Sequence, residues 1–336
     1  MIMTHLRKGP IAAAFLLLAA VAAAPAVDPT MLNYVMPDAR VVGGINVTTA
    51  MTSPFGQYLL SRIQTEDKDF QQFIDLTGFD PRRDLSEIVF ASPGQHGQKT
   101  GMVVVRGTFQ ISKILALATQ HNQTVTSYNG ADVIINAHSG TDSGWVAFLN
   151  GSLALAGDTA SVKGALDRRG ASGLKADLSA QAQALSSRYQ AWFLSTVPVN
   201  ELTGRVPEVT GSAPAAPRGD FFQGVQQVSG GALFGTQVEL SLNATTRSDR
   251  DAQALADVVR FLAGMVQQNQ DKPEAANLAK ILDTLDLKTA GPVTTITLSI
   301  PEADLEKLLQ SKQPQAGGHV RRHRPGVPAP ETAPAK

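Results

Sequence analysis

Gly78-Phe-Asp-Pro-Arg-Arg-Asp-Leu85 and the two apolar runs behind it, Ile88–Ala91 and Met102–Val105, decide the fold. The octapeptide is rich in turn-forming residues. Both runs are short and mainly β-branched, so they predict buried strands. The loop Pro93–Gly101 between them is rich in glycine and predicts a hairpin. Apolar residues then recur at helical spacing over 111–118, so the unit is turn, strand, hairpin loop, strand, helix.

The same order recurs along the chain. Asn129-Gly130 and Asn150-Gly151 are typical of tight hairpin turns, because both positions tolerate positive φ, and Asp158 can cap the following helix. Further copies are predicted over 232–266 and 285–309. Hairpins favour antiparallel pairing, and each helix must bury its apolar stripe on a sheet face. The sequence therefore predicts an α+β fold, mainly antiparallel sheets built from repeated strand-turn-strand-helix units in two similar halves.

Shorter elements precede the octapeptide. Val27–Arg40, with two prolines, predicts an extended lead-in, and Val41–Val47 predicts the first strand. Ser53-Pro54 predicts a helix start, with a cap residue followed by proline at the first helical position. Gly78 is placed to end the next helix in a left-handed turn.

The first 26 residues follow the pattern of a secretory signal peptide. His5, Arg7 and Lys8 form a basic start, Ile11–Ala23 is an apolar run, and Ala24-Pro25-Ala26 supplies small residues for cleavage. The apolar run is short for a bilayer span, and no second one follows. We expect residues 1–26 to be removed and the mature chain to be periplasmic or extracellular, without a transmembrane span.

Composition shifts divide the mature chain. We predict a first α+β domain over 27–170, a second over 171–312, and a disordered, basic, proline-rich tail over 313–336. The stretch 200–218 predicts a flexible loop in the second domain. The tail segment His319–Arg324 could contact anionic surfaces, but the composition favours a solvated, solubilising segment, because basic flanks are often just solvated.

The absence of cysteine excludes disulfides, a cysteine nucleophile and a lipid-bearing cysteine. Basic and acidic residues are equal in number, at 29 each, and the tail holds part of the positive charge. A nucleic-acid-binding body is therefore not expected. No phosphate-binding glycine loop or metal-ligand spacing occurs, so the sequence predicts no cofactor and no metal.

The turn 80–84 holds the candidate binding residues Asp80, Arg82, Arg83 and Asp84. Two neighbouring arginines can form a fork for a carboxylate or phosphate group. The structural alternative is that Asp80 caps a short helical turn and the arginines pair with Asp84 or Glu87 at the surface.

A hydrolase is the rival class of function. His138, Asp142 and Ser143 fall within one loop, and Asp-Ser-Gly resembles the serine site of chymotrypsin-like proteases over a few residues only. A catalytic set needs rigid mutual geometry, which one hairpin loop does not supply. The alternative to a binding protein is therefore a secreted hydrolase that uses Ser143 or a carboxylate pair such as Asp80 and Asp84.

Three short motifs, Met36-Pro-Asp-Ala39, Gly78–Leu85 and Arg106-Gly-Thr-Phe109, resemble those of a group of uncharacterised exported bacterial proteins. The resemblance covers mainly Leu32–Arg169. It implies export and a repeated α/β build, and it carries no functional residues. With no convergent catalytic set, the sequence predicts a non-enzymatic binding or structural protein of the bacterial envelope, whose partner is an unidentified protein or envelope component.

Overall fold

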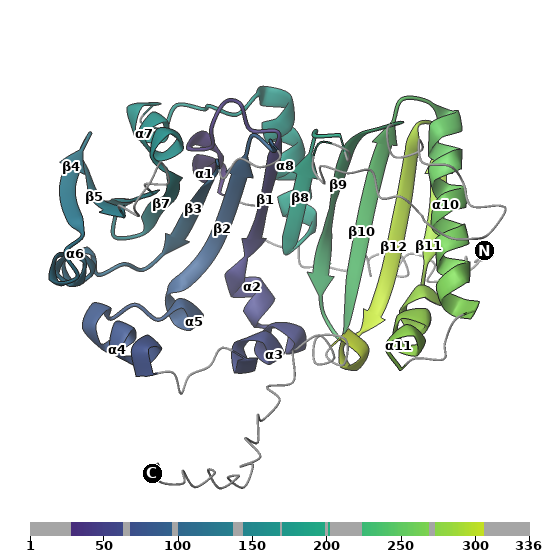
Figure 1. The fold of residues 1–336 in the computed structure, drawn as a ribbon, viewed down its shortest axis with the longest axis horizontal. Helices are drawn as coiled ribbons and strands as arrows, with labels where there is room; N and C mark the ends of the chain where they lie inside the picture. Colours follow the sequence, from purple (N-terminus) through teal and green to yellow (C-terminus); the bar gives the residue numbers. More distant parts are fainter. Residues whose placement is uncertain are drawn as a thin grey trace, which may run out of the picture.

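The computed structural model describes residues 28–305 except 63–67, 96–99, 137–143, 169, 199–200, 202–223 and 269–272. Its strands form one twelve-stranded antiparallel sheet in the order β11-β12-β10-β9-β8-β1-β2-β3-β7-β6-β5-β4 (Figure 1). The predicted α+β class and antiparallel pairing are confirmed, with a single sheet in place of several. The predicted signal peptide and tail, and nearly all of the loop 200–218, lie outside the described residues.

The strands have the following bounds. They are β1 (Val41–Asn46), β2 (Leu85–Ser92), β3 (Met102–Gly107), β4 (Thr124–Tyr128), β5 (Ala131–Asn136), β6 (Gly144–Asn150), β7 (Leu153–Asp158), β8 (Ala191–Ser195), β9 (Val225–Phe234), β10 (Gln237–Thr246), β11 (Asp286–Ala290) and β12 (Val293–Pro301).

The helices are mostly short. They are α1 (Pro29–Asn33), α2 (Val47–Met51), α3 (Pro54–Arg62), α4 (Lys68–Thr77), α5 (Pro81–Asp84), α6 (Ile111–Gln120), α7 (Thr159–Arg168), α8 (Ala176–Arg188), α10 (Asp249–Gln268) and α11 (Pro273–Leu282).

Turn and cap residues behave as their chemistry predicts. Asn129 and Gly130 both have positive φ, at 50° and 84°, and join β4 to β5 in a tight hairpin. The Asp158 carboxylate accepts a hydrogen bond from the Ser161 amide at 3.0 Å and so caps α7. Gly78 follows α4 with φ of 70°. These local predictions are confirmed.

The extended lead-in predicted over 27–40 is wrong, because α1 occupies its start. Asp28 accepts a hydrogen bond from the Thr30 amide at 2.9 Å, and Pro29 takes the first helical position. Met31 and Leu32 of α1 are fully buried. Apolar contact with the sheet therefore stabilises a helix too short to form alone.

One face of the sheet, which we call the core face, carries the main hydrophobic core. Val42, Val89, Val104 and Leu155 lie on it at paired or alternate strand positions. Helices α1, α7 and α8 cover it, and their apolar residues join the same buried cluster.

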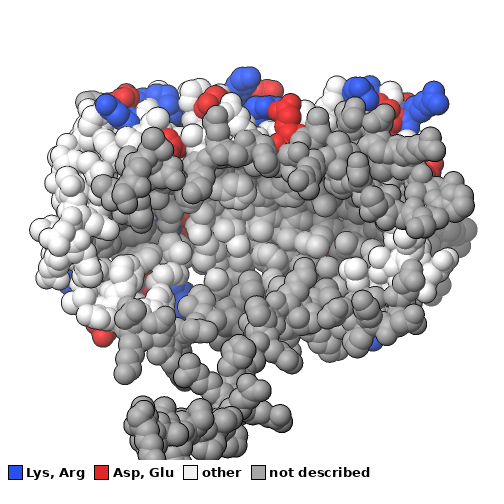
Figure 2. All heavy atoms as spheres, in the orientation of Figure 1, with Lys and Arg blue, Asp and Glu red and all other residues white. Residues whose placement is uncertain are grey.

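The opposite face, which we call the pocket face, carries the side chains that alternate along each strand with those of the core face. Ala154, Phe148 and Ile134 lie on it and form a second cluster with α6. Farther along the sheet, Ala244 on the same face packs with Leu255 of α10. In the view of Figure 2, charged side chains gather along the upper edge, whereas the described surface below that edge is mainly uncharged.

Candidate functional site

An apolar cavity of about 660 Å³ lies between the pocket face and helices α4, α5 and α6. Its floor includes Ile88 of β2, Val105 of β3 and Ala154 of β7, which are neighbours across the sheet. Small-molecule sites in proteins have volumes of roughly 300–1,000 Å³ and walls that are mainly apolar. In size and lining, the cavity is therefore a candidate ligand site.

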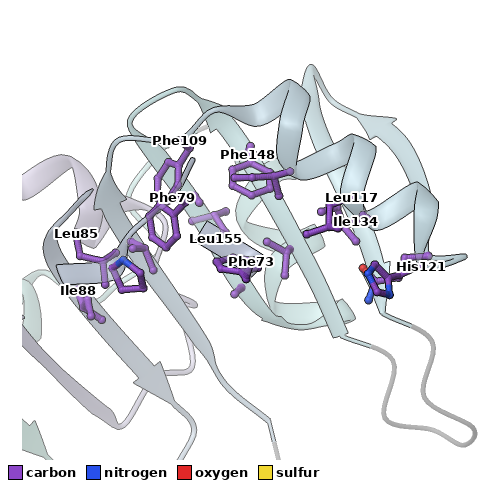
Figure 3. A pocket seen from close by; sticks show the side chains of 18 residues that line it. Phe73, Phe79, Leu85, Ile88, Phe109, Leu117, His121, Ile134, Phe148 and Leu155 are labelled. Carbon is purple, nitrogen blue, oxygen red and sulfur yellow. The ribbon is translucent and has the colours of Figure 1, made fainter. Parts of the chain in front are cut away.

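A row of phenylalanines forms one side of the cavity (Figure 3). Ring centroids are 6.4 Å apart for Phe73 and Phe79, 5.4 Å for Phe79 and Phe109, and 5.5 Å for Phe109 and Phe148. These separations are typical of favourable aromatic pairs. The row links α4 to β6 and holds the helical wall against the sheet.

Backbone hydrogen bonds fix the two rings that lie outside regular elements. The Phe109 amide donates to Gly151 O at 2.8 Å, and the Phe79 amide donates to Thr77 Oγ1 at 3.1 Å. Gly78 turns the chain at the end of α4, so that Phe79 points into the cavity. These hydrogen bonds therefore hold both rings in the cavity wall.

Polar side chains line the cavity mainly at one end. His121, which follows α6, lies at the opposite end of the cavity from Leu85 and Ile88 (Figure 3), and Gln123 is close to it in sequence. Among the described lining residues His121 is the single titratable side chain, and no group of metal-ligating side chains occurs among the described residues. Such a lining can bind and orient an apolar molecule, but it supplies no paired acid and base.

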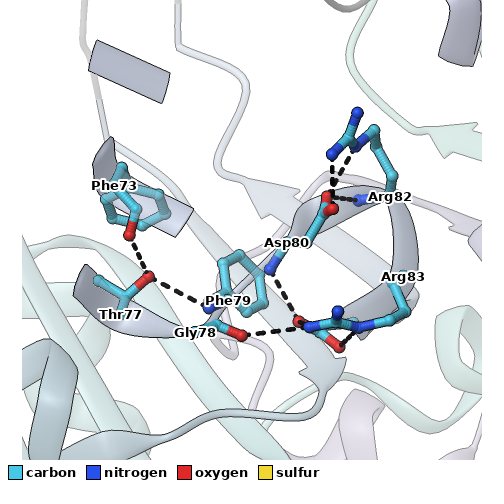
Figure 4. A network of polar contacts seen from close by, with 8 residues as sticks. Phe73, Thr77, Gly78, Phe79, Asp80, Arg82 and Arg83 are labelled. Carbon is cyan, nitrogen blue, oxygen red and sulfur yellow. Dashed lines mark hydrogen bonds and ion pairs between the residues drawn. The ribbon is translucent and has the colours of Figure 1, made fainter. Parts of the chain in front are cut away.

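The candidate binding residues of the turn 80–84 are brought together in one network of hydrogen bonds and ion pairs (Figure 4). The Asp80 carboxylate caps α5 by accepting from the Arg82 amide at 3.0 Å, and it also pairs with the Arg82 guanidinium at 2.6 Å. Arg83 donates to Asp84 at 2.8 Å, and Asp84 accepts from the Asp80 amide at 2.7 Å. Each guanidinium is thus paired with a carboxylate, and neighbouring Pro81 lines the cavity.

The structural alternative predicted for this turn is confirmed for the Asp80 cap and for the Arg83–Asp84 pair. Arg82 pairs with Asp80, and Glu87 lies on the core face, where its nearest cation is Arg106 at 3.8 Å. Burial raises the pKa of Glu87, and Arg106 partly offsets this rise. Hydrogen bonds from the Arg82 and Arg83 guanidinium groups hold the pKa values of Asp80 and Asp84 below their usual range.

The charged turn should make stability depend on pH. The pKa of Asp84 is lowered by folding, so its contribution is present above the ordinary aspartate value of about 4 and is lost as pH falls through the lowered value. We expect Asp84→Asn to reduce the free energy of unfolding by about 1–3 kcal/mol at neutral pH and by less in acid, as measured by urea titration at a series of pH values. Asp257→Asn, at an exposed ion pair with Arg260, should change it by less than about 1 kcal/mol. A deficit for Asp84→Asn that persists in strong acid would contradict this assignment.

His138, Asp142 and Ser143 of the hydrolase alternative lie outside the described residues. The sequence also gave no indication that Phe73, Phe79, Phe109 and Phe148 would share a cavity. Two of these rings, Phe79 and Phe109, lie outside the predicted helices and strands. An aromatic residue in a turn was the one local feature that could have pointed to the site.

Comparisons with known proteins find similarity only in the backbone fold, and not in the sequence. No family model matches the chain, and no curated protein matches it. Two crystal structures of TP0453 from Treponema pallidum are similar to it, in crystal forms I and IV. Crystal form I has 11% sequence identity and a TM-score of 0.46, and the match covers 86% of this chain and 98% of that one. Crystal form IV has 9% identity and a TM-score of 0.47, over 82% and 96%. No residue role is transferred from either.

Proposed function

We propose that the chain is an exported, non-enzymatic binding protein of the bacterial envelope that takes an apolar small molecule into the cavity beneath α4 and α6. The observation that carries the proposal is the cavity itself, with about 660 Å³ of space behind the row from Phe73 to Phe148. A hydrocarbon ligand in the cavity would remove its apolar wall from contact with water. This burial favours binding by roughly 25 cal/mol for each Å² of apolar surface buried.

The location in the envelope is supported by the leader pattern over residues 1–26. No helix among the described residues is both long and apolar enough to cross a bilayer. The role that we propose for the turn 80–84 is to position the cavity wall, because its arginines are paired with its own aspartates while Phe79 and Pro81 line the cavity.

Titration with cis-parinaric acid, a fluorescent fatty acid, tests this function. We expect saturable binding of one cis-parinaric acid molecule per protein molecule, because the cavity is preformed and apolar. Palmitate should displace the bound probe. Fluorescence that rises without saturation, or that palmitate does not lower, would overturn the proposal.

A further inference from the structure

A second apolar hollow adjoins the cavity on the pocket face. It has a volume of about 330 Å³, lies over β1, β8, β9 and β10, and is lined by side chains that include Ile45, Phe90, Phe193, Leu240 and Leu242. We call it the central groove. Register places these five side chains on the same face of the sheet as Ile88 in the cavity.

The cavity and the central groove meet at one pair of side chains. Ile88 lines the cavity, Ile45 lines the central groove, and the two are directly opposite each other in the β1–β2 pairing. Such pairs have Cβ atoms about 4.5–5.5 Å apart. Phe90 lies two residues beyond Ile88 and is 41% exposed, with its ring over Gly43, where a Cβ atom would lie 2.3 Å from the ring. The apolar floor therefore continues from the cavity into the central groove.

Hydrocarbon fits this floor better than a peptide does. The groove lies over interior strands that pair on both sides, so their backbone groups are used within the sheet. An extended peptide laid on the face would bury its own backbone N–H and C=O groups without partners. Hydrocarbon chains carry no such groups.

We infer that the ligand is a lipid with two hydrocarbon chains, one in the cavity and the other in the central groove. This inference rests on the proposed function. Two hollows that join at a single point, Ile45 against Ile88, match two chains that diverge from one head group. A single-chain lipid would occupy the cavity and leave the central groove unfilled.

Monopalmitoyl- and dipalmitoylphosphatidylglycerol test this inference, because they share a head group and differ in chain number. Each is titrated against wild-type protein loaded with cis-parinaric acid. We expect the two-chain lipid to bind at least about tenfold more tightly, since its second chain buries many additional methylene groups. Equal affinities would overturn the inference while leaving the proposed function standing. Failure of both lipids to displace the probe would count against the cavity as well.

A matched pair of variants locates the second chain. Leu240→Lys puts a charge in the central groove, whereas Asn243→Lys puts the same charge on the opposite face of β10, at a residue that does not line the groove. Leu240→Lys should remove the advantage of the two-chain lipid and leave the one-chain lipid unchanged. Asn243→Lys should change neither affinity. An advantage that survives in Leu240→Lys, or an equal loss for both lipids, would overturn the inference.

Discussion

Replacing Leu194 by alanine is expected to lower the free energy of unfolding by about 2–5 kcal/mol, because the substitution removes buried methyl groups and leaves a cavity in the core. Leu194 is 1% exposed and lies on β8, which joins β1 on one side to β9 on the other. In register it faces Val42 and Ser229. The loss is measured as a shift of the urea midpoint.

Hydrogen exchange shows whether this loss spreads along the whole sheet. Because β8 joins the strands from β1 to β4 to the strands from β9 to β11 in one sheet, we expect amides of β3 and of β10 to lose protection together in Leu194→Ala. Leu278→Ala, the same chemical change at a side chain that is 40% exposed on α11, should cost much less. Loss of protection confined to β9–β12 would contradict cooperative stabilisation through β8.

Local chemistry made much of the fold predictable. Asn129-Gly130 accommodates positive φ in a hairpin turn, and Gly78 does so at the end of α4. Asp158 accepts a hydrogen bond from an amide in the first turn of α7. Each of these signals involves only residues that are close together in the sequence. Asp28-Pro29 gave the same kind of signal for α1, a cap followed by proline. The two prolines of 27–40 nevertheless led to the prediction of an extended segment, because the core that stabilises α1 is distant in sequence.

Long-range pairing could not be predicted in this way. Strand β8 was not predicted, and its pairing with β1 brings together residues about 150 positions apart. The cavity has the same origin, because its walls come from helices and strands between residues 73 and 156. In the sequence the strand residues of this lining are ordinary core positions. Only the register of β2, β3 and β7 shows that they face one space.

Filling the cavity should abolish ligand binding. Ala154 is 5% exposed, lies on β7 and lines the cavity, so an indole at this position would occupy space that the ligand needs. We expect Ala154→Trp to weaken binding of cis-parinaric acid by at least about a hundredfold, equivalent to roughly 2.7 kcal/mol. Overpacking costs about 1–3 kcal/mol of stability, so the urea midpoint is measured alongside.

Two further variants separate blocking of the site from loss of fold. Ala156→Leu makes a smaller intrusion from a half-buried position in the same lining and should weaken binding about tenfold. Ala160→Trp adds the same indole at an exposed position on α7, a helix on the core face, and should leave affinity unchanged.

The most direct test of the cavity as the ligand site is the affinity of folded Ala154→Trp for cis-parinaric acid, compared with wild type and Ala160→Trp. The cavity assignment predicts binding in wild type and Ala160→Trp and its loss in Ala154→Trp. Wild-type affinity in a folded Ala154→Trp would place the ligand elsewhere and contradict the assignment.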